Sequence, residues 1–575
     1  MTKKRYLVTS ALPYANGPLH YGHLAGVYIP SDIYVRHLKL KKEKVIHISG
    51  SDEHGVAIML NAKKANRPYK EYVDSWHQEH KKIFALHQIE FDFFGQTSAD
   101  YHAKETIKWF HSLNSKGLIG TKIEKQLYHE FCKNYLPDRF VEGTCYECGY
   151  ANARGDECPN CGALIDSIRL KNPVCKICGG KDNIKIVDST QYFILLSKFH
   201  TEYRKWLDTK KDNWRKTVGP YVDSLTAEGL HDRAITRDID WGIDVPLADT
   251  KGKKLYVWFD APIGYVSNTK EYLKSINSKE DYKKDWWQNL ETEIVNFLGK
   301  DNIIFHAIIF PVMSMASGEA HAVDDIPANQ YLNLVGKQFS KSQGHYVDAN
   351  EAIKEFGPDA IRYYLISIMP ENADSSFTWE DFAAKVNGEL ANNIGNLFSR
   401  CLKFFIKQWP DGLEENFFQT FLKGDLALGF TKSFGDMKNA LDSKNFRRAL
   451  EEIMKFGLQV NHTFTLKAPW SSIKTDKDQA ANTIASTSVA ILLLGIMFRP
   501  FLPGLSEKML APYKHLLSDE EVKDFYSDKD IEAAISKLIK KVFSGTFRPG
   551  VLPDMLVPKI DDKRIAELSQ QLAGK

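Results

Sequence analysis

Several features that would mark other classes of protein are missing from this chain. No run of about 18 apolar residues occurs, so no membrane-spanning helix is predicted, and the longest apolar stretch, residues 488–498, fits a buried helix. The first residues, Met-Thr-Lys-Lys-Arg, lead straight into an apolar segment without the architecture of a signal peptide. The 76 basic and 73 acidic side chains leave a net charge of only +3, so charge neither indicates nor excludes a nucleic-acid partner. We therefore expect a cytoplasmic protein that does not contact a membrane.

Cysteine is scarce as well, with eight residues in a chain of 575. That number does not support a disulfide scaffold in a protein of this size, and the Cys-x-x-Cys pairing of six of them indicates metal in a reducing compartment. The length exceeds what one hydrophobic core serves, so the chain should hold several domains.

The cysteine pairs have the spacing of zinc knuckles. Cys145-x2-Cys148 is followed after nine residues by Cys158-x2-Cys161. Four thiolates suit a tetrahedral zinc with no open position for water or substrate, which is a structural rather than a catalytic site. A third pair, Cys175 and Cys178, needs partners, and the upstream residues with knuckle spacing are His129 and Cys132. These four residues either bind a second zinc or leave a single zinc with the remaining cysteines free.

The most informative motif is a loop near the start that carries two histidines. An apolar run over residues 6–12 predicts a buried strand, and an apolar-periodic stretch over residues 24–40 predicts a helix. Between them lie His20, Gly22 and His23, at the end of the helix where free backbone N–H groups and the helix dipole favour an anion. The arrangement suits a nucleotide phosphate chain. The alternative is that both histidines cap the helix or bond within the fold.

A second apolar run, residues 44–50, predicts another strand and leads directly to Asp52. Ligands of open parallel sheets gather beyond the carboxyl ends of the strands, so Asp52 is placed to meet a substrate amine. The alternative from local sequence is a helix N-cap.

Strand–helix alternation extends over the first 117 residues, is interrupted by the cysteine-rich region, and returns with the apolar runs at 254–260 and 303–306. From about 385 to 545 the pattern is almost wholly helical, followed by a Pro-rich extended tail and a short charged helix. Two apolar stripes mark the helical part, the first formed by Leu390, Ile394, Leu397 and Leu402 and the second by Leu450, Ile453, Phe456 and Leu458.

The loop sequence from Ala11 to His23 closely resembles the HIGH signature of class I aminoacyl-tRNA synthetases, in the form of the methionyl-tRNA synthetase family. Tyr21 stands where the family has a small aliphatic residue, and we expect its side chain to point away from the phosphates. Residues 336–344, which alone would suit a solvated surface loop, resemble the KMSKS signature. Gln338 and Phe339 replace its first lysine and its methionine, whereas Lys341 matches the lysine that the family uses at the phosphates.

A third stretch, residues 254–265, resembles the wall of the family's methionine pocket. Aromatic rings around an unbranched thioether gain about 0.3–1.5 kcal/mol per sulfur–aromatic contact. Taken singly, Trp258 and Tyr265 would be read as core, and Arg237 as a partner of Asp238 or Asp240. The resemblance implies a methionine site of Leu12, Tyr14, Asp52, Trp258, Ala261, Pro262, Tyr265 and His306, an ATP site of His20, Gly22, His23, Asp301, Ser340, Lys341 and Ser342, and catalytic roles for His20, His23, Lys341 and Arg237.

Three residues of the helical part match the family's anticodon readers. Asn396 and Arg400 lie four residues apart, on one face of a helix, and Trp470 follows a helix break. An unpaired base stacked on an aromatic ring gains roughly 1–3 kcal/mol, and arginine or asparagine can read base edges. Without the resemblance, Trp470 would be assigned to the core and Asn396 to a buried helix face.

The resemblance implies an α/β fold, in which a Rossmann-type parallel-sheet domain is split by a zinc-knuckle insertion and followed by an all-α anticodon-binding bundle. The expected divisions are 1–117 and 236–335 for the two catalytic halves, 118–235 for the insertion, 336–385 for the lysine-loop and stem-contact region, 386–545 for the helical domain, and 546–575 for the tail. Related synthetases often hold two zinc ions in nested pairing, which matches the assignment of His129, Cys132, Cys175 and Cys178 to one site.

The implied reaction joins methionine to ATP, giving methionyl-adenylate and pyrophosphate, and then passes methionine to the 2′-hydroxyl of the terminal adenosine of tRNA(Met). Mg²⁺ accompanies the highly charged ATP phosphates. Because no further module follows the tail, we expect a monomer. Three rivals remain: a class I synthetase for another apolar or thiol amino acid, a small nucleotidyltransferase, and a non-catalytic zinc- and RNA-binding protein derived from a synthetase.

Overall fold

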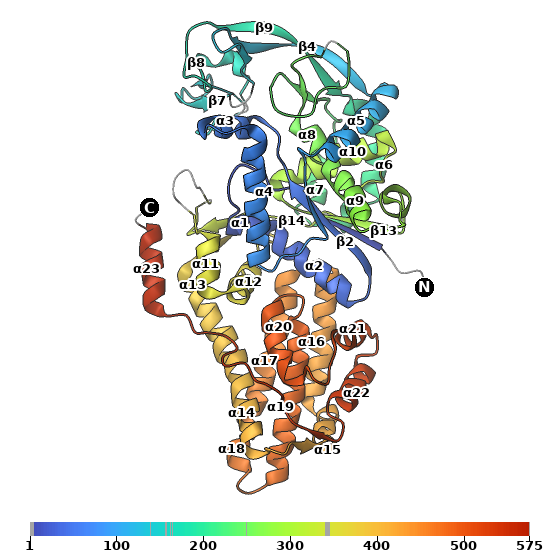
Figure 1. The fold of residues 1–575 in the computed structure, drawn as a ribbon, viewed down its shortest axis with the longest axis vertical. Helices are drawn as coiled ribbons and strands as arrows, with labels where there is room; N and C mark the ends of the chain where they lie inside the picture. The colour runs from blue at the N-terminus through green and yellow to red at the C-terminus, as the bar shows by residue number, and fades with distance from the viewer. Residues whose placement is uncertain are drawn as a thin grey trace.

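The computed structural model of the chain describes residues 5–137, 140–155, 158–161, 163, 165–248, 250–337, 339 and 346–573. Its elements form an upper part built on a parallel sheet and a lower part made of long helices (Figure 1). The cysteine-rich region lies at the upper edge, on the two long strands β4 and β9. This arrangement confirms the predicted fold class.

The central sheet has five parallel strands in the order β14-β13-β1-β2-β3. They are β1 (Arg5–Ser10), β2 (Lys44–Ser51), β3 (Phe93–Gln96), β13 (Thr292–Gly299) and β14 (Ala328–Asn329). The chain leaves β1 toward β2 on one side and returns much later to β13 on the other, so the strand order reverses at β1. In open parallel sheets such a reversal opens a crevice at the carboxyl ends of the strands, where ligands bind.

Helices pack against this sheet and bury the side chains of its strands. The helix predicted after the first loop is present as α1 (Tyr21–His23), η1 (Leu24–Tyr28) and α2 (Ile29–Leu40), which pack on β1, β2 and β13. Helix α9 (Ile263–Ser275) packs on β2 and β3 and against α5 (Asp100–Ser115). Further helices of the upper part are α3 (Val56–Lys64), α4 (Tyr69–Leu86), α6 (His200–Asp208), α7 (Gly219–Leu225), α8 (Val257–Asp260), α10 (Phe310–Ser317) and α11 (Ala349–Phe356).

Two apolar runs differ from their expected strand–helix character. Residues 254–260 contribute only the two-residue strand β12 (Lys254–Leu255) before α8 begins, and residues 303–306 run into η8 (Phe305–Ile309). The strand of that region is β13, which ends at Gly299, seven residues before His306. A short buried apolar run suits a strand and a buried helix equally, so periodicity alone could not separate them.

The cysteine-rich insertion is an antiparallel β structure. Strands β4 (Ile119–His129) and β9 (Ile184–Ile194) pair along their whole length and are flanked by β5 (Asn134–Tyr135) and β10 (Arg233–Ala234). A second small sheet contains β6 (Val141–Thr144), β7 (Ala153–Arg154) and β8 (Lys171–Cys175). Every cysteine pair lies in a turn or at a strand end of this region.

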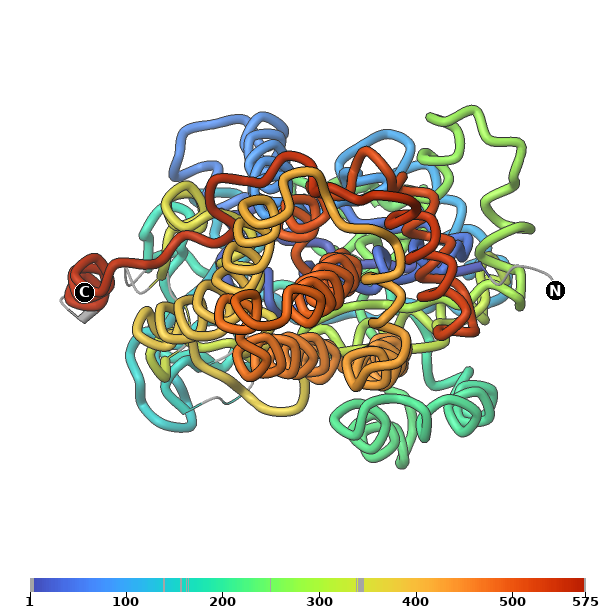
Figure 2. Tube along the Cα trace, turned by 90° about the horizontal axis from the view of Figure 1, so that it is seen from below, coloured from blue at the N-terminus to red at the C-terminus, as the bar shows by residue number. Residues whose placement is uncertain are grey.

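The lower part is a bundle whose long helices are seen end-on in Figure 2. They are α14 (Asn396–Gln408), α16 (Asp425–Asp442), α17 (Phe446–Lys467) and α19 (Lys477–Phe498), joined by the shorter α18 (Pro469–Ser472), α20 (Pro503–Leu510), α21 (Asp519–Ser527) and α22 (Ile531–Val542). The first predicted stripe is buried, as are Leu450, Ile453 and Phe456 of the second. Leu458 is 59% exposed, so its assignment was wrong. Two residues beyond Phe456, it lies about 200° around the helix from the buried face.

Helix α19 is long and apolar enough to cross a membrane by length and composition, but 89% of its most apolar window is buried inside the protein. The prediction of a buried helix at 488–498 is confirmed. After the bundle, the chain runs extended to α23 (Asp562–Ala573), which packs on α13 (Trp379–Lys385) back in the upper part.

The two parts meet through polar contacts in which at least one side chain is buried. Arg362 of α12 (Pro358–Ser367) donates to Asp32 of α2 at 2.7 Å and to the carbonyl of Phe501 at 2.8 Å. His37 of α2 lies 2.9 Å from Asp442 of α16. Both Arg362 and His37 are fully buried, so these contacts fix α2 against the bundle.

Candidate active site and metal clusters

A cavity of about 660 Å³ opens at the carboxyl ends of the sheet strands, at the reversal of strand order. Its volume falls in the range of small-molecule sites. Eight residues implied by the resemblance line it: Leu12, Tyr14, His20, Gly22, His23, Asp52, Trp258 and Asp301. They come from the loops after β1, β2 and β13 and from α8, so residues nearly 290 positions apart share one cavity.

The two histidines stack at the start of the first helix. Their ring centroids are 3.8 Å apart, and His23 Nδ1 accepts the backbone N–H of His20 at 3.2 Å. They cap the helix and also line the cavity, so the capping role is compatible with a phosphate site. Gly22 is required between them, because an added Cβ would lie 2.9 Å from the His20 ring. Tyr21 is fully buried and points away from the cavity, as expected.

The lysine loop, residues 336–344, contacts the first histidine through Phe339, one of its three described residues. The ring of Phe339 stacks on that of His20, with centroids 4.8 Å apart and planes only 3° from parallel. Gln338, Ser340, Lys341, Ser342 and Gly344 lie outside the described residues. Phe339 thus joins the second motif to the first across more than 300 residues of sequence.

Asp52 follows the last residue of β2 and is held by the first loop. Its backbone N–H donates to the carbonyl of Pro13 at 2.9 Å, and its carbonyl accepts the N–H of Ala15 at 2.8 Å. Burial, reinforced by the charge of Asp260, raises the pKa of the Asp52 carboxyl well above its ordinary value. One buried carboxylate oxygen, Oδ1, has no hydrogen-bond partner among the described residues. The N-cap of the next helix is Gly55, so the alternative role for Asp52 as an N-cap is wrong.

An aromatic wall lines the same cavity as Asp52. Trp258 is 37% exposed, stacks on Phe305 with centroids 3.8 Å apart, and donates its Nε1–H to the Tyr256 hydroxyl at 2.7 Å. Its exposure to the cavity excludes the interpretation of Trp258 as a core residue. Leu12 and Tyr14 complete this end of the cavity.

Four residues expected at the methionine end do not line the cavity: Ala261, Pro262, Tyr265 and His306. Tyr265 is a buried core residue whose hydroxyl lies 2.7 Å from His306 Nε2. Since His306 Nδ1 lies 2.9 Å from the carbonyl of Asn302, the proton sits on Nδ1 and Nε2 accepts from the tyrosine. Burial lowers the pKa of His306 to about 4, so this imidazole is neutral.

Arg237 also lies beside the cavity rather than on it. Its guanidinium is 3.9 Å from the centroid of the Tyr256 ring, whose hydroxyl binds Trp258. The proposed partners of Arg237 are engaged elsewhere: Asp238 accepts from Lys253, and Asp240 lies 3.7 Å from Lys63. Arg237 is therefore connected to the aromatic wall through Tyr256.

Several lining residues were not predicted from the sequence, including Tyr256, Phe339 and residues 330–333. Residues 330–333 follow β14, and Tyr331 donates its hydroxyl proton to Asp301. Phe305, next to His306 in the chain, stacks on Trp258. The rule that ligands gather beyond parallel strands would have found residues 330–333 had β13 and β14 been placed correctly.

The cysteine-rich region brings its ligands together as two separate groups of four. In the first, Cys145 Sγ lies 4.0 Å from Cys161 Sγ, and Cys148 Sγ lies 3.7 Å from Cys158 Sγ. Zn–S bonds of about 2.3 Å place tetrahedral sulfurs about 3.8 Å apart, so these separations fit a zinc.

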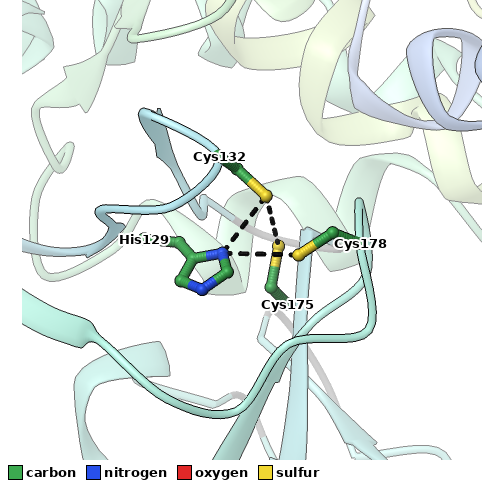
Figure 3. A group of neighbouring side chains, drawn as sticks. All are labelled: His129, Cys132, Cys175 and Cys178. Atoms are coloured by element: carbon green, nitrogen blue, oxygen red, sulfur yellow. Dashed lines mark hydrogen bonds between the residues drawn. The ribbon is translucent and has the colours of Figure 1, made fainter.

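The second group contains His129, Cys132, Cys175 and Cys178, whose side chains converge on one point in Figure 3. His129 Nδ1 lies 3.2 Å from Cys132 Sγ and 3.5 Å from Cys178 Sγ. The other ring nitrogen, Nε2, donates to the carbonyl of Asp182 at 2.9 Å, which leaves Nδ1 deprotonated toward the sulfurs. Both groups could hold a metal ion, and the outer pairs enclose the inner ones in sequence as nested pairing requires.

Of the three residues expected to read the anticodon, Trp470 belongs to α18, at the lower end of the bundle (Figure 1), and Asn396 and Arg400 belong to α14. The guanidinium of Arg400 lies 4.8 Å from the centroid of the Trp470 ring, which is 39% exposed. Asn396 is exposed on the same helix. The alternatives of a core tryptophan and a buried asparagine are wrong.

Comparisons with known proteins divide the chain into two matched regions. Residues 6–402 match the family model of class I tRNA synthetases of the M type, and residues 422–575 match the anticodon binding domain of methionyl tRNA ligase.

The similar curated proteins are methionine–tRNA ligases. The one from Thermococcus kodakarensis is 42% identical over 532 residues, covering 90% of this chain and 71% of the relative. The one from Pyrococcus furiosus is also 42% identical, with 90% and 72% coverage, and that of Protochlamydia amoebophila is 41% identical, with 88% and 72%. In fold, the chain is similar to a Mycobacterium tuberculosis methionyl-tRNA synthetase bound by methionyl-adenylate, with a TM-score of 0.75, 21% identity, and coverage of 96% of this chain and 100% of that one.

Proposed function

The chain belongs to the methionyl-tRNA synthetase family of class I aminoacyl-tRNA synthetases, and we propose how its residues divide the work of that family's reaction. The enzyme is a methionine–tRNA ligase: it forms methionyl-adenylate from methionine and ATP, and transfers methionine to tRNA(Met). The methionine-type catalytic domain excludes a synthetase for another amino acid, and the anticodon domain excludes a small nucleotidyltransferase.

For methionine, we assign the ammonium group to Asp52 and the side chain to the wall formed by Trp258, Leu12 and Tyr14. The observation that carries this assignment is the buried Oδ1 of Asp52, which has no partner among the described residues and borders the same cavity as the aromatic wall. A bound ammonium would compensate the burial that raises the pKa of this carboxyl. Tyr265, Ala261, Pro262 and His306 would support the wall from behind rather than contact methionine.

For ATP, we assign the phosphates to the N–H groups of His20 and His23, the adjoining helix N-terminus, and Lys341. The methionine carboxylate attacks the α-phosphorus, a bond forms between its oxygen and phosphorus, and pyrophosphate leaves with the former bond electrons. The histidines would stabilise the charge that develops on the phosphate oxygens. No side chain acts as a nucleophile, so the rate comes from positioning and fixed charge. Mg²⁺ would accompany the ATP phosphates, as their charge requires.

For tRNA, we assign anticodon contact to Asn396, Arg400 and Trp470. An exposed indole beside a guanidinium offers a base one stacking surface and one set of hydrogen-bond donors. The terminal adenosine would reach the cavity, where its 2′-hydroxyl attacks the activated carbonyl and releases AMP.

For the metal clusters, we propose two structural zinc ions, one bound by Cys145, Cys148, Cys158 and Cys161, and one by His129, Cys132, Cys175 and Cys178. The donor sets and sulfur separations fit tetrahedral zinc, which would fold the insertion without taking part in the chemistry. A monomeric state and a cytoplasmic location stay predictions from the sequence.

The decisive measurement is ATP–pyrophosphate exchange with each amino acid in turn. We expect exchange with methionine and none above background with leucine or valine, because branched side chains would not fit the aromatic wall. Exchange without an amino acid, or with several of them equally, would contradict the assignment of the cavity.

A further inference from the structure

A buried hydrogen bond, outside the cavity lining, joins the segment that carries Asp52 to the helix that carries Trp258. His54 Nδ1 lies 2.7 Å from Asp260 Oδ2, and the two residues are only 4% and 0% exposed. His54 follows Asp52 by two residues, and Asp260 follows Trp258 by two residues in α8. Neither His54 nor Asp260 lines the cavity, so neither would contact methionine.

The carboxylate at the centre of this bond is held by a second imidazole. His102 Nε2 lies 3.4 Å from the same Oδ2 atom, and its Nδ1 lies 3.0 Å from the hydroxyl of Ser267. Burial alone would raise the pKa of Asp260, but the two histidines outweigh it and hold that pKa below its ordinary value. Asp260 is therefore a charged acceptor, and charge-assisted hydrogen bonds are the stronger kind.

The segment around Asp52 is fixed on its other side as well. Trp241 Nε1 donates to the carbonyl of Glu53 at 2.6 Å, and Gln96 Nε2 donates to the Glu53 carboxylate at 3.0 Å. The neighbours of Asp52 are thus anchored away from the cavity, while its own carboxylate borders it. Among the hydrogen bonds described for this segment, the His54–Asp260 bond is the one that reaches α8, the helix that contains Trp258.

We propose that His54 and Asp260 are positioning residues for methionine, whose bond sets the separation between the ammonium-binding Asp52 and the side-chain-binding Trp258. The inference rests on the proposed function. Methionine must touch both walls at once, and a displacement of about 1 Å in a reacting group can cost up to about a hundredfold in rate. ATP is held by the histidine loop instead, so loss of the bond should affect methionine and spare ATP.

The test compares two replacements of His54 in the full chain. His54→Leu keeps the packing volume and removes the donor, and we expect it to raise the KM for methionine about tenfold in ATP–pyrophosphate exchange, with the KM for ATP within about twofold. His54→Asn places an amide nitrogen where the imidazole Nδ1 was, so we expect it to restore the KM for methionine to within about threefold of the unaltered enzyme.

A matched control removes a similar bond far from the cavity. His37 is buried and lies 2.9 Å from Asp442, between α2 and the bundle, so His37→Leu should lower the melting temperature without raising the KM for methionine. The inference is overturned if His54→Leu leaves the KM for methionine unchanged, if it raises both KM values equally, or if His54→Asn behaves like His54→Leu.

The remaining outcomes are a His54→Leu variant that does not fold and an unaltered chain without activity. If His54→Leu does not fold, Asp260→Asn, which keeps the size and an acceptor oxygen but not the charge, should raise the KM for methionine about threefold, and no rise would overturn the inference. If the unaltered chain shows no methionine-dependent exchange, the proposed function fails and this inference with it. Exchange by the unaltered chain with an unchanged KM in the variants overturns the inference alone.

Discussion

The cavity and the lower tip of the bundle are assembled in different ways. The cavity collects residues from the ends of β1, β2 and β13 and from α8, and its key carboxylate oxygen is buried. At the tip, Asn396 and Arg400 lie one helical turn apart, and Trp470 joins them with an exposed ring. Fixed charges act strongly where water is excluded, which suits bond making, whereas a base can stack only on a ring that solvent reaches. The two sites should therefore fail independently, one in activation and the other in tRNA charging.

The largest effect is expected from His20→Ala. Removal of a donor aimed at developing phosphate charge should lower the rate of ATP–pyrophosphate exchange by about 10²–10³-fold, and should leave tRNA binding at the tip unchanged. Tyr21→Phe is the control, because Tyr21 is buried next to His20 and its hydroxyl has no partner among the described residues. A similar loss in Tyr21→Phe would show that the effect is one of folding.

Asp52→Asn should come next. Replacement of a charged acceptor costs about 1.5–3 kcal/mol, so we expect the KM for methionine to rise roughly ten- to a hundredfold in the exchange assay. Asp240→Asn, an exposed aspartate beside Lys63, should change nothing. An unchanged methionine KM in Asp52→Asn would remove Asp52 from the ammonium site.

Trp470→Ala tests the other side of the comparison. Loss of one stacked base, at about 1–3 kcal/mol, should lower tRNA charging roughly ten- to a hundredfold while exchange stays nearly intact. Leu466→Ala, which removes a 75% exposed side chain from the neighbouring helix α17, is the matched control. Equal loss of charging and exchange would refute the assignment of Trp470 to the anticodon.

The pH dependence should sharpen the same distinction. Asp52 binds the ammonium only when ionised, and its raised pKa means that protonation begins at a higher pH than for an ordinary aspartate. The KM for methionine should therefore rise as the pH falls, by about tenfold for each unit below that pKa, and the KM in Asp52→Asn should be flat. A methionine KM that is independent of pH in the unaltered enzyme would show that another group binds the ammonium.

The smallest effect is expected in the metal clusters. Metal analysis should find two zinc ions per chain, and His129→Ala should reduce that number to one. Cys401→Ser, at a buried cysteine outside both clusters, should leave the zinc content unchanged. A clean one-to-one ratio in the unaltered protein would eliminate the second site.

Prediction succeeded where the determining residues are close in sequence. The ligands of each knuckle are three residues apart, and the structure groups the four pairs as the nested assignment expects. It failed where an apolar run was ambiguous: residues 254–260 are mostly helix rather than strand, and Leu458 lies on the exposed side of α17. Tyr256 and Phe305 were missed because their contacts with Trp258, a hydrogen bond and a ring stack, form only in the fold.

The sequence by itself determined the family, the two signature loops, the candidate metal ligands and the residue types of the cavity. These depend on local spacing, since a loop, a knuckle or a helix face is specified by neighbours in the chain. Only the tertiary structure showed that Ala261, Pro262, Tyr265 and His306 do not line the cavity, and that Phe339 stacks on His20. It also decided that His54 meets Asp260, 206 residues away. Such contacts follow from strand order and packing, which bring distant segments together.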